Sequence, residues 1–332
     1  MIDWLTISID ITKLNPSTRK RLDAYSEKIV KIAEGGEIKW TTGCFQSLRS
    51  DMSGLAWSFG NRLTLAGSPA SIIHTNNVFG TSDIIWAFRY MRDFFEQHMW
   101  VELPDIEHWS CSRIDVTHNY DLGGQIAVSQ ALEYFRQCPT RGNNVERRHS
   151  TVYWNKSSTI RSGKAYNKYE HAKNMTSKNR AYYTKEQLEV TKRLLRLELK
   201  LGRHWIAKQL REHGIAWHQM TETYLNNAHS DFFEDLTNDI EVPTLDNLLD
   251  KLIEVCPTEG QAKAAFGYYN TIRSIGSESA KRTTTKATHY RHIKNLKAAG
   301  LTTADITSGE ILSFRPQYIT MKPVSTWDDL VA

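Results

Sequence analysis

The chain has 332 residues, of which 40% are hydrophobic and 24% charged, an ordinary composition for a soluble globular protein of one or two domains. No apolar run reaches the roughly 18 residues of a membrane span, and the start, Met1-Ile2-Asp3-Trp4-Leu5, lacks the basic region of a signal peptide. Four scattered cysteines without metal-finger spacing predict reduced thiols. We therefore expect a cytoplasmic protein that does not contact a membrane.

The formal net charge of +5 is unevenly distributed along the chain. Residues 141–211 carry 18 Lys and Arg against 5 Asp and Glu, and residues 261–300 carry 8 against 1. The intervening segment 212–260 contains 11 acidic residues and one lysine. Basic runs are often no more than solvated helix faces, but two of them divided by an acidic segment favour two surfaces that bind one polyanion.

Hydrophobic periodicity and turn residues predict the following elements in chain order. Strands are expected over 1–10, 55–59, 63–66, 111–119, 151–155, 162–170 and 194–201. Helices are expected over 18–33, 83–98, 125–137, 184–191, 264–274, 278–282 and 286–299. Strands separated by single helices and hairpins indicate an α+β fold in which helices flank a central, largely antiparallel sheet.

Three segments of the chain are predicted. A sheet domain occupies 1–211, an acidic helical connector 212–260, and a helical module 261–332. In the last segment a short helix, the turn Thr283-Thr284-Thr285 and a longer basic helix have the outline of a helix-turn-helix or winged-helix module. Residues 311–321 are expected to form a strand pair or to pack back on the domain.

Side-chain alternation places polar residues of three strands on one surface. Ile114 and Val116 point to the core, as do four leucines between 195 and 201, so their neighbours point the other way. The surface opposite the core then carries Asp115, then Arg196, Glu198 and Lys200, and then Lys164, Tyr166, Lys168 and Glu170. Such a face is either solvated and crossed by ion pairs or a site for chemistry on phosphate, and the surrounding basic segment favours the second.

Phosphoryl transfer to tyrosine requires what this face contains. A phenol with a pKa of about 10 becomes a useful nucleophile only beside a cation or a base. Lys168 is expected to face the same way as Tyr166 and to stabilise the phenolate or the phosphate. Two or three carboxylates would supply oxygen ligands for Mg²⁺ or Mn²⁺.

Several stretches, in order along residues 1–201, carry a family resemblance. They are Met1-Ile2-Asp3-Trp4-Leu5, Asn77-Val78-Phe79-Gly80-Thr81-Ser82-Asp83, Ser112-Arg113-Ile114-Asp115-Val116-Thr117, Ser150-Thr151-Val152-Tyr153-Trp154-Asn155, Ala165-Tyr166-Asn167-Lys168 and Leu195-Arg196-Leu197-Glu198. The set resembles the replication initiators of filamentous bacteriophages, the gene II protein family. The resemblance implies a rolling-circle nickase that cuts the plus strand of double-stranded replicative DNA, leaves a 3′-OH primer, holds the 5′ phosphate on tyrosine and later rejoins the displaced strand.

By that resemblance the nucleophile is Tyr166, and Asp115 and Glu198 are metal ligands for Mg²⁺ or Mn²⁺. The His-hydrophobe-His pair of better-known rolling-circle nickases does not occur in the chain. A third ligand therefore stays open between Glu170 and His171, while His118 is interpreted as structural because alternation turns it away from Asp115. The resemblance also implies origin duplex and single-stranded DNA as substrates and a host helicase and polymerase as partners, and it allows a homodimer.

Two other tyrosines compete with Tyr166 for the role of nucleophile. Tyr169 is three residues on, so a strand would turn it to the core face, and Tyr153 on a neighbouring strand is the main rival. Residues expected to contact DNA are Lys164, Arg196 and Lys200 on the sheet, and Lys281, Arg282, Lys286, His289, Tyr290, Arg291 and Lys294 in the helical module. The competing interpretations are a non-catalytic DNA-binding regulator with the same fold and a relaxase- or transposase-like nickase.

Overall fold

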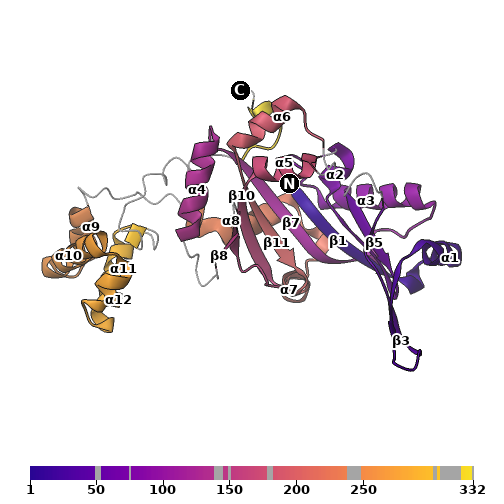
Figure 1. Ribbon diagram of the computed structural model, residues 1–332, viewed down its shortest axis with the longest axis horizontal. Helices are drawn as coiled ribbons and strands as arrows, with labels where there is room; N and C mark the ends of the chain where they lie inside the picture. The colour runs from indigo at the N-terminus through magenta and orange to yellow at the C-terminus, as the bar shows by residue number, and fades with distance from the viewer. Residues whose placement is uncertain are drawn as a thin grey trace.

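The computed structural model describes residues 1–48, 54–74, 76–137, 145–148, 151–177, 182–237, 248–301, 305–306 and 323–330. Figure 1 shows a sheet with helices on both faces and, at the orange end of the chain, a separate group of helices. In the described residues no helix is both long and apolar enough to span a bilayer.

The sheet has nine strands within the described residues, in the order β4-β5-β6-β1-β7-β11-β10-β9-β8. Every described pairing between these strands is antiparallel. The strands are β1 (Ile2–Asp10), β4 (Gln46–Ser47), β5 (Leu55–Phe59), β6 (Arg62–Gly67), β7 (Ser110–Asp121), β8 (Val145–Arg148), β9 (Thr151–Trp154), β10 (Arg161–Asn167) and β11 (Leu194–Gly202). The predicted α+β fold with a largely antiparallel central sheet is confirmed.

The helices that belong to the sheet domain are α1 (Pro16–Tyr25), α2 (Pro69–His74), α3 (Ile84–Met99), α4 (Gln125–Gln137), α5 (Lys168–Ser177), α6 (Lys185–Val190), α7 (Arg203–His213) and α8 (Glu222–Thr237). Short 3₁₀ turns occupy Ile11–Lys13, Ile106–His108, Thr191–Arg193, Trp217–Gln219 and Asp328–Leu330. Asp83 caps α3 by accepting hydrogen bonds from the backbone N–H groups of Ile85 and Trp86, as expected for an aspartate at the start of a helix.

One face of the sheet carries the main hydrophobic core. Alternate residues of the central strands, such as Leu5, Ile114 and Leu199, are fully buried there. Helices α3, α4, α7 and α8 contribute apolar side chains to the same core. The opposite face, towards α5 and α6 at the top of Figure 1, has a smaller cluster around Val78 and Leu194, which the C-terminal Leu330 joins.

A second hydrophobic core belongs to the helices α9 (Leu248–Val255), α10 (Glu259–Ile275), α11 (Ser277–Arg282) and α12 (Lys286–Ala298). Thr285 caps α12 by accepting a hydrogen bond from Thr288 N–H, so the turn between α11 and α12 is short. The three helices predicted between 264 and 299 are therefore present, with α10 longer than expected. Residues 311–321 lie outside the described part of the chain.

Three expectations about local structure and boundaries were wrong. The helix expected over 18–33 ends at Tyr25, because the segment Lys28–Ile32, rich in β-branched residues, forms strand β2, which pairs with β3 (Ile38–Gly43) as a separate hairpin. The strand expected over 162–170 ends at Asn167, whose Oδ1 accepts a hydrogen bond from Tyr169 N–H and starts α5. The core of the sheet domain also extends past residue 211 to Phe233, since α8 packs on the sheet.

Candidate active site

The polar residues of β7, β11 and β10 share one face of the sheet, because these strands are neighbours. Glu198 lies opposite Lys164 on one side and Thr117 on the other. One step along, Arg196 lies opposite Tyr166 and Asn119. Asp115 is diagonal to Glu198 on the same face, as alternation predicted. Residues 115, 166 and 198 therefore lie on the same face of the sheet, and the Tyr166 hydroxyl contacts Glu198.

Tyr166 is at the centre of this polar cluster. The residue is 5% exposed, and its hydroxyl donates a hydrogen bond to Glu198 Oε2 over 3.3 Å. Burial raises the pKa of Tyr166 above its ordinary value, while the charges of Arg196 and Lys164 oppose that rise. The phenol is consequently protonated at neutral pH, and the Glu198 carboxylate accepts its hydrogen bond.

The carboxylates of Glu198 and Asp115 are each paired with a cation. Lys164 Nζ lies 2.6 Å from Glu198 Oε1, and Arg113 Nε donates to Asp115 Oδ1 over 2.7 Å. Burial raises the pKa of Asp115 to about 7; the hydrogen bonds from Arg113 oppose the rise and the charge of Glu198 adds to it. The side chains of Lys164 and Arg113 are 32% and 39% exposed, so the cluster opens to solvent on their side.

The fit of these residues to Mg²⁺ or Mn²⁺ depends on Asp115 and Glu198. Among the described residues, no group of three or more His, Cys, Asp or Glu side chains converges on one point. Two carboxylates on adjacent strands still suit such a cation, because Mg²⁺ commonly binds one or two carboxylates together with water and substrate phosphate. Arg113 and Lys164 hold the same oxygens and would have to release some of them.

Lys168 occupies a different position from the one the sequence predicted. It is the first residue of α5, not a strand residue beside Tyr166, and it is fully buried. Its ammonium group donates to Asn77 Oδ1 over 2.7 Å and to the Asn77 carbonyl over 3.3 Å. Burial, followed by the charge of Arg196, lowers the pKa of Lys168 well below its ordinary value. Its contacts anchor the 76–78 loop.

Arg196 is also buried rather than available to DNA, which corrects its predicted role. It has no exposed surface, and its guanidinium donates to Asn119 Oδ1 over 2.8 Å and to the Asn77 and Val78 carbonyls over 2.6 Å. Its Nη1 lies 3.5 Å from Asp3 Oδ1. Arg196 therefore connects β11, β7, β1 and the 76–78 loop.

Asp3, Asn77 and Asn119 are members of the cluster that the sequence interpretation missed. Asp3 has the same parity as the core residues Leu5 and Ile7, so regular alternation would bury it in the core. A register shift between Ile2 and Trp4 turns Asp3 towards Arg196 instead. An acid at a core position of a strand was the available signal, and Asn119 follows from continuing the alternation of β7 past Thr117.

The remaining candidates for catalysis and metal binding differ in their position relative to the cluster, and among them the His171 ring lies 5.7 Å from the Tyr166 ring. Glu170 is exposed on α5, so it is not on the face of Tyr166 and does not supply a third carboxylate there. Tyr169 is a half-buried helix residue with Lys192 over its ring, not a core strand residue. Tyr153 is opposite Lys164 on β9 and lies under Lys156. His118 contacts Asn226 on the other face, as expected for a structural residue.

The predicted DNA contacts fall into three groups. Lys200 and Lys164 are half-exposed on the polar face, whereas Arg196 is buried. In the helical module, His289 is buried and its Nδ1 lies 2.6 Å from Tyr268 Oη, so it packs inside the module and does not face a ligand. The other predicted contacts there are all exposed: Lys281, Arg282, Lys286, Tyr290, Arg291 and Lys294.

Comparison with known proteins identifies the family. The model of the N-terminal region of the phage replication-associated protein, the gene II protein, matches residues 1–222, which include all the described strands of the sheet and the whole polar cluster. The chain belongs to this family of phage replication initiators. The resemblance predicted from the ordered motifs is thus confirmed.

Curated relatives extend the similarity beyond that region. The replication-associated gene II protein of Enterobacteria phage f1 is 22% identical to this chain over 310 residues, covering 77% of the chain and 75% of the relative. Its counterpart in Enterobacteria phage M13 matches with the same identity and coverage. A solved rolling circle replication initiator protein from Geobacillus stearothermophilus has 12% identity and a TM-score of 0.27, covering 65% of this chain and 79% of that one.

Proposed function

We propose that this member of the gene II protein family nicks one strand of origin DNA with Tyr166 and retains the 5′ phosphate as a phosphotyrosine. The observation that carries the proposal is the hydrogen bond from the Tyr166 hydroxyl to Glu198, inside a cluster that also contains Asp115, Lys164 and Arg113. A nucleophile, a base and cations for phosphate then lie on one sheet face.

The chemical step balances with the side chains of the cluster and the DNA. Tyr166 Oη attacks the phosphorus as its proton passes to Glu198, and the bond between phosphorus and the 3′ oxygen breaks. The 3′ oxygen leaves and takes up the proton that Glu198 returns through solvent water, giving the 3′-OH that primes synthesis. Reversal of the step, with a 3′-OH attacking the phosphotyrosine, rejoins the displaced strand. Lys164 and Arg113, the partly exposed members, are placed to contact the phosphate oxygens.

Asp115 and Glu198 would hold the divalent cation, which when bound supplies positive charge at the scissile phosphate. Until then, Arg113 and Lys164 hold the two carboxylates in a fixed position. Arg196 and Lys168 act indirectly, as positioning residues, because their hydrogen bonds fix the 76–78 loop against β7 and β11.

A direct test of the proposed function is a search for the covalent adduct. The protein is incubated with supercoiled origin DNA and Mn²⁺, the product is denatured, and the peptide that retains nucleotide is sequenced. We expect the adduct on the peptide that contains Tyr166, attached to the 5′ end. Nicked DNA without a protein adduct, or an adduct on another tyrosine, would overturn the assignment.

Mn²⁺ affinity is expected to depend on pH through Asp115. Because its pKa is raised to about 7, the carboxyl is increasingly protonated below that pH and must lose the proton when a cation binds. Affinity should therefore rise by up to about tenfold per pH unit from pH 5 and level off above pH 7. Calorimetric titration of the DNA-free protein measures this, and Asp115→Asn should bind more weakly and without the pH dependence. A flat profile for the wild type would contradict the ligand assignment.

We also propose that α12 binds duplex DNA as part of a helix-turn-helix or winged-helix module. Its exposed residues include Lys286, Arg291 and Lys294. If Lys294 contacts a phosphate, Lys294→Gln should weaken duplex binding equally for all sequences and lower the log–log salt slope by about 0.9. The matched control is Lys263→Gln on α10, whose ammonium is paired with Glu259 at 2.6 Å and should contribute no phosphate contact. An unchanged slope for Lys294→Gln would remove this residue from the interface.

A further inference from the structure

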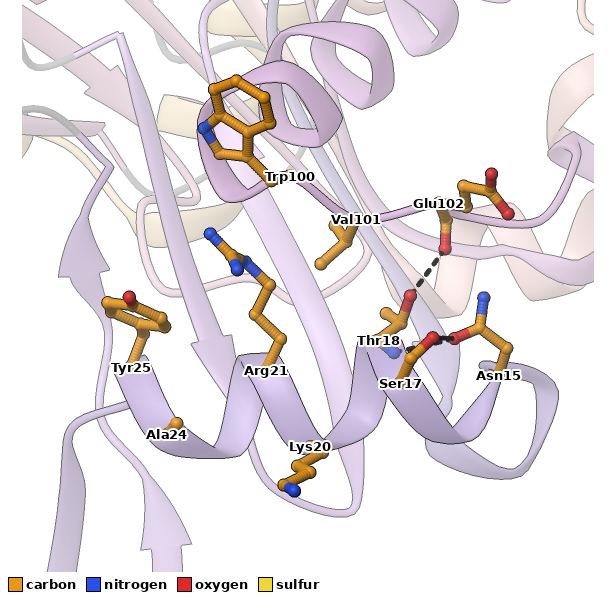
Figure 2. A pocket seen from close by; sticks show the side chains of 10 residues that line it. All are labelled: Asn15, Ser17, Thr18, Lys20, Arg21, Ala24, Tyr25, Trp100, Val101 and Glu102. Atoms are coloured by element: carbon orange, nitrogen blue, oxygen red, sulfur yellow. Dashed lines mark hydrogen bonds between the residues drawn. The ribbon is translucent and has the colours of Figure 1, made fainter.

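A concave surface lies outside the polar cluster, between α1 and the turn that follows α3. Its cavity measures about 820 Å³. We call it the α1 groove and define it by Lys20, Arg21, Tyr25, Trp100 and Glu102, which line it (Figure 2). Thr18 Oγ1 donates to the Glu102 carbonyl over 3.1 Å, so the two walls are held together at the base.

Trp100 is the unusual residue of the α1 groove. It ends α3 in the left-handed conformation, with φ 54° and ψ 50°, where glycine or asparagine is the common choice. A bulky side chain in that conformation is strained, and this one is 80% exposed. Neither packing nor backbone geometry therefore favours an indole at this position.

The rest of the α1 groove pairs a second aromatic ring with positive charge. Tyr25 is 60% exposed, and the Arg21 guanidinium lies over its ring at 5.5 Å from the centroid. Arg21 Nε also donates to the Met99 carbonyl next to Trp100. In Figure 2 the Arg21 side chain rises from α1 on the side of Tyr25 and Trp100. Arg21 thereby fixes the two aromatic walls relative to each other.

The net charge of helix α1 is positive, whereas that of the surrounding chain is negative. Residues 1–140 contain 13 Lys and Arg against 16 Asp and Glu. Helix α1, in contrast, carries three basic residues in a row, 19–21, and one acid, Asp23. A local basic segment within an acidic half of the protein favours an anionic ligand at this place.

We propose that the α1 groove binds single-stranded DNA, with unstacked bases against Trp100 and Tyr25 and phosphates beside Lys20 and Arg21. Exposed aromatic rings next to cations are the means by which proteins hold single strands irrespective of sequence. A duplex cannot use them, because its bases are stacked on each other. The inference rests on the proposed function, since nicking and synthesis release a displaced strand that this surface would hold.

The α1 groove is separate from the nicking cluster. Asp3 of the cluster and Asp10, which leads into α1, stand at opposite ends of β1. At about 3.3 Å per strand residue they are roughly 23 Å apart. Substitutions in the groove therefore leave Tyr166 and its neighbours in place, and binding can be measured apart from nicking.

The test uses the full chain carrying Tyr166→Phe, without metal, and a fluorescent oligothymidine of about 15 nucleotides. Because stacking on an aromatic side chain contributes about 1–3 kcal/mol per base, Trp100→Ala should weaken binding about 5- to 150-fold. Trp100→Phe should retain most of the affinity. Trp86→Ala is the matched control, an exposed tryptophan near the other end of the same helix that should change affinity less than about twofold.

Further arms separate loss of binding from loss of folding and from failure of the proposed function. Trp100→Gly removes the backbone strain, so its Tm should be unchanged or higher while oligonucleotide binding falls. An iodouracil-containing strand should cross-link to the peptide that contains Trp100 or to that of Tyr25. Three outcomes would overturn the groove assignment. They are equal loss of single-strand and duplex affinity, unchanged affinity in Trp100→Ala, and cross-links only to other peptides. Unchanged single-strand affinity would leave a protein as the ligand of the groove. With Tyr166 intact, Trp100→Ala should still form the nicking adduct; absence of that adduct from the wild type would instead refute the proposed function.

Discussion

Tyr166→Phe is expected to abolish the covalent protein–DNA adduct and to lower the nicking rate by at least about 10³-fold, because no other group in the cluster replaces the nucleophile. The substitution removes one hydroxyl, whose only described hydrogen bond goes to Glu198. The ring, which is buried, keeps its packing. The measurement is conversion of supercoiled to open-circular origin DNA in Mn²⁺, together with the yield of adduct.

Two other tyrosines provide the matched controls for this result. Tyr153→Phe removes a hydroxyl from the neighbouring strand β9, and Tyr169→Phe removes one from α5. Both variants should nick at close to the wild-type rate. If Tyr166→Phe nicks normally and Tyr153→Phe does not, the nucleophile is on β9, where its ring faces Lys156.

Arg196→Met is expected to lower the free energy of unfolding by about 3–5 kcal/mol, the usual cost of removing one partner from a buried ion pair. The change leaves Asp3 buried without its paired cation and removes one of two donors from each of the Asn77 and Val78 carbonyls. For a domain of this size the Tm should fall by roughly 6–20 °C. Urea and thermal unfolding, followed by circular dichroism, measure both quantities.

Lys200→Met is the control for Arg196→Met, since it lies four residues on along the same strand and face. Lys200 is half-exposed, so its replacement should change stability by less than about 1 kcal/mol. Adding Asp3→Asn to Arg196→Met should restore part of the loss, because the uncompensated charge is then removed. A wild-type Tm for Arg196→Met would show that the buried network does not hold the sheet and the 76–78 loop together.

Much of the sheet and part of the site could be predicted because strand alternation is a local property. Leu195, Leu197 and Leu199 fix which face of β11 is buried, and so they also fix where Glu198 points. The same reasoning placed Asp115 and Tyr166 correctly. It failed at Lys168, because a strand end depends on a cap, and the cap at Asn167 competes with a pattern that is equally typical of a strand.

Contacts between residues far apart in the sequence could not be predicted from strand alternation. No local signal relates Asn77 to Lys168, which are 91 residues apart, or Arg196 to Asp3. The DNA role predicted for Arg196 was wrong for the same reason. Its charge was visible in the sequence, but its burial depends on the loop that covers it.

By itself, the sequence determined the α+β class, the strands and the polar face, since side-chain periodicity and turn chemistry act over a few residues. It also carried the motifs that indicated the family, and the comparison confirmed that family. Only the tertiary structure decided which charges are buried partners and which remain accessible, because burial and pKa depend on elements brought together from distant parts of the chain. Tyr166, Glu198 and Asp115 share one face because antiparallel pairing sets β10, β11 and β7 side by side.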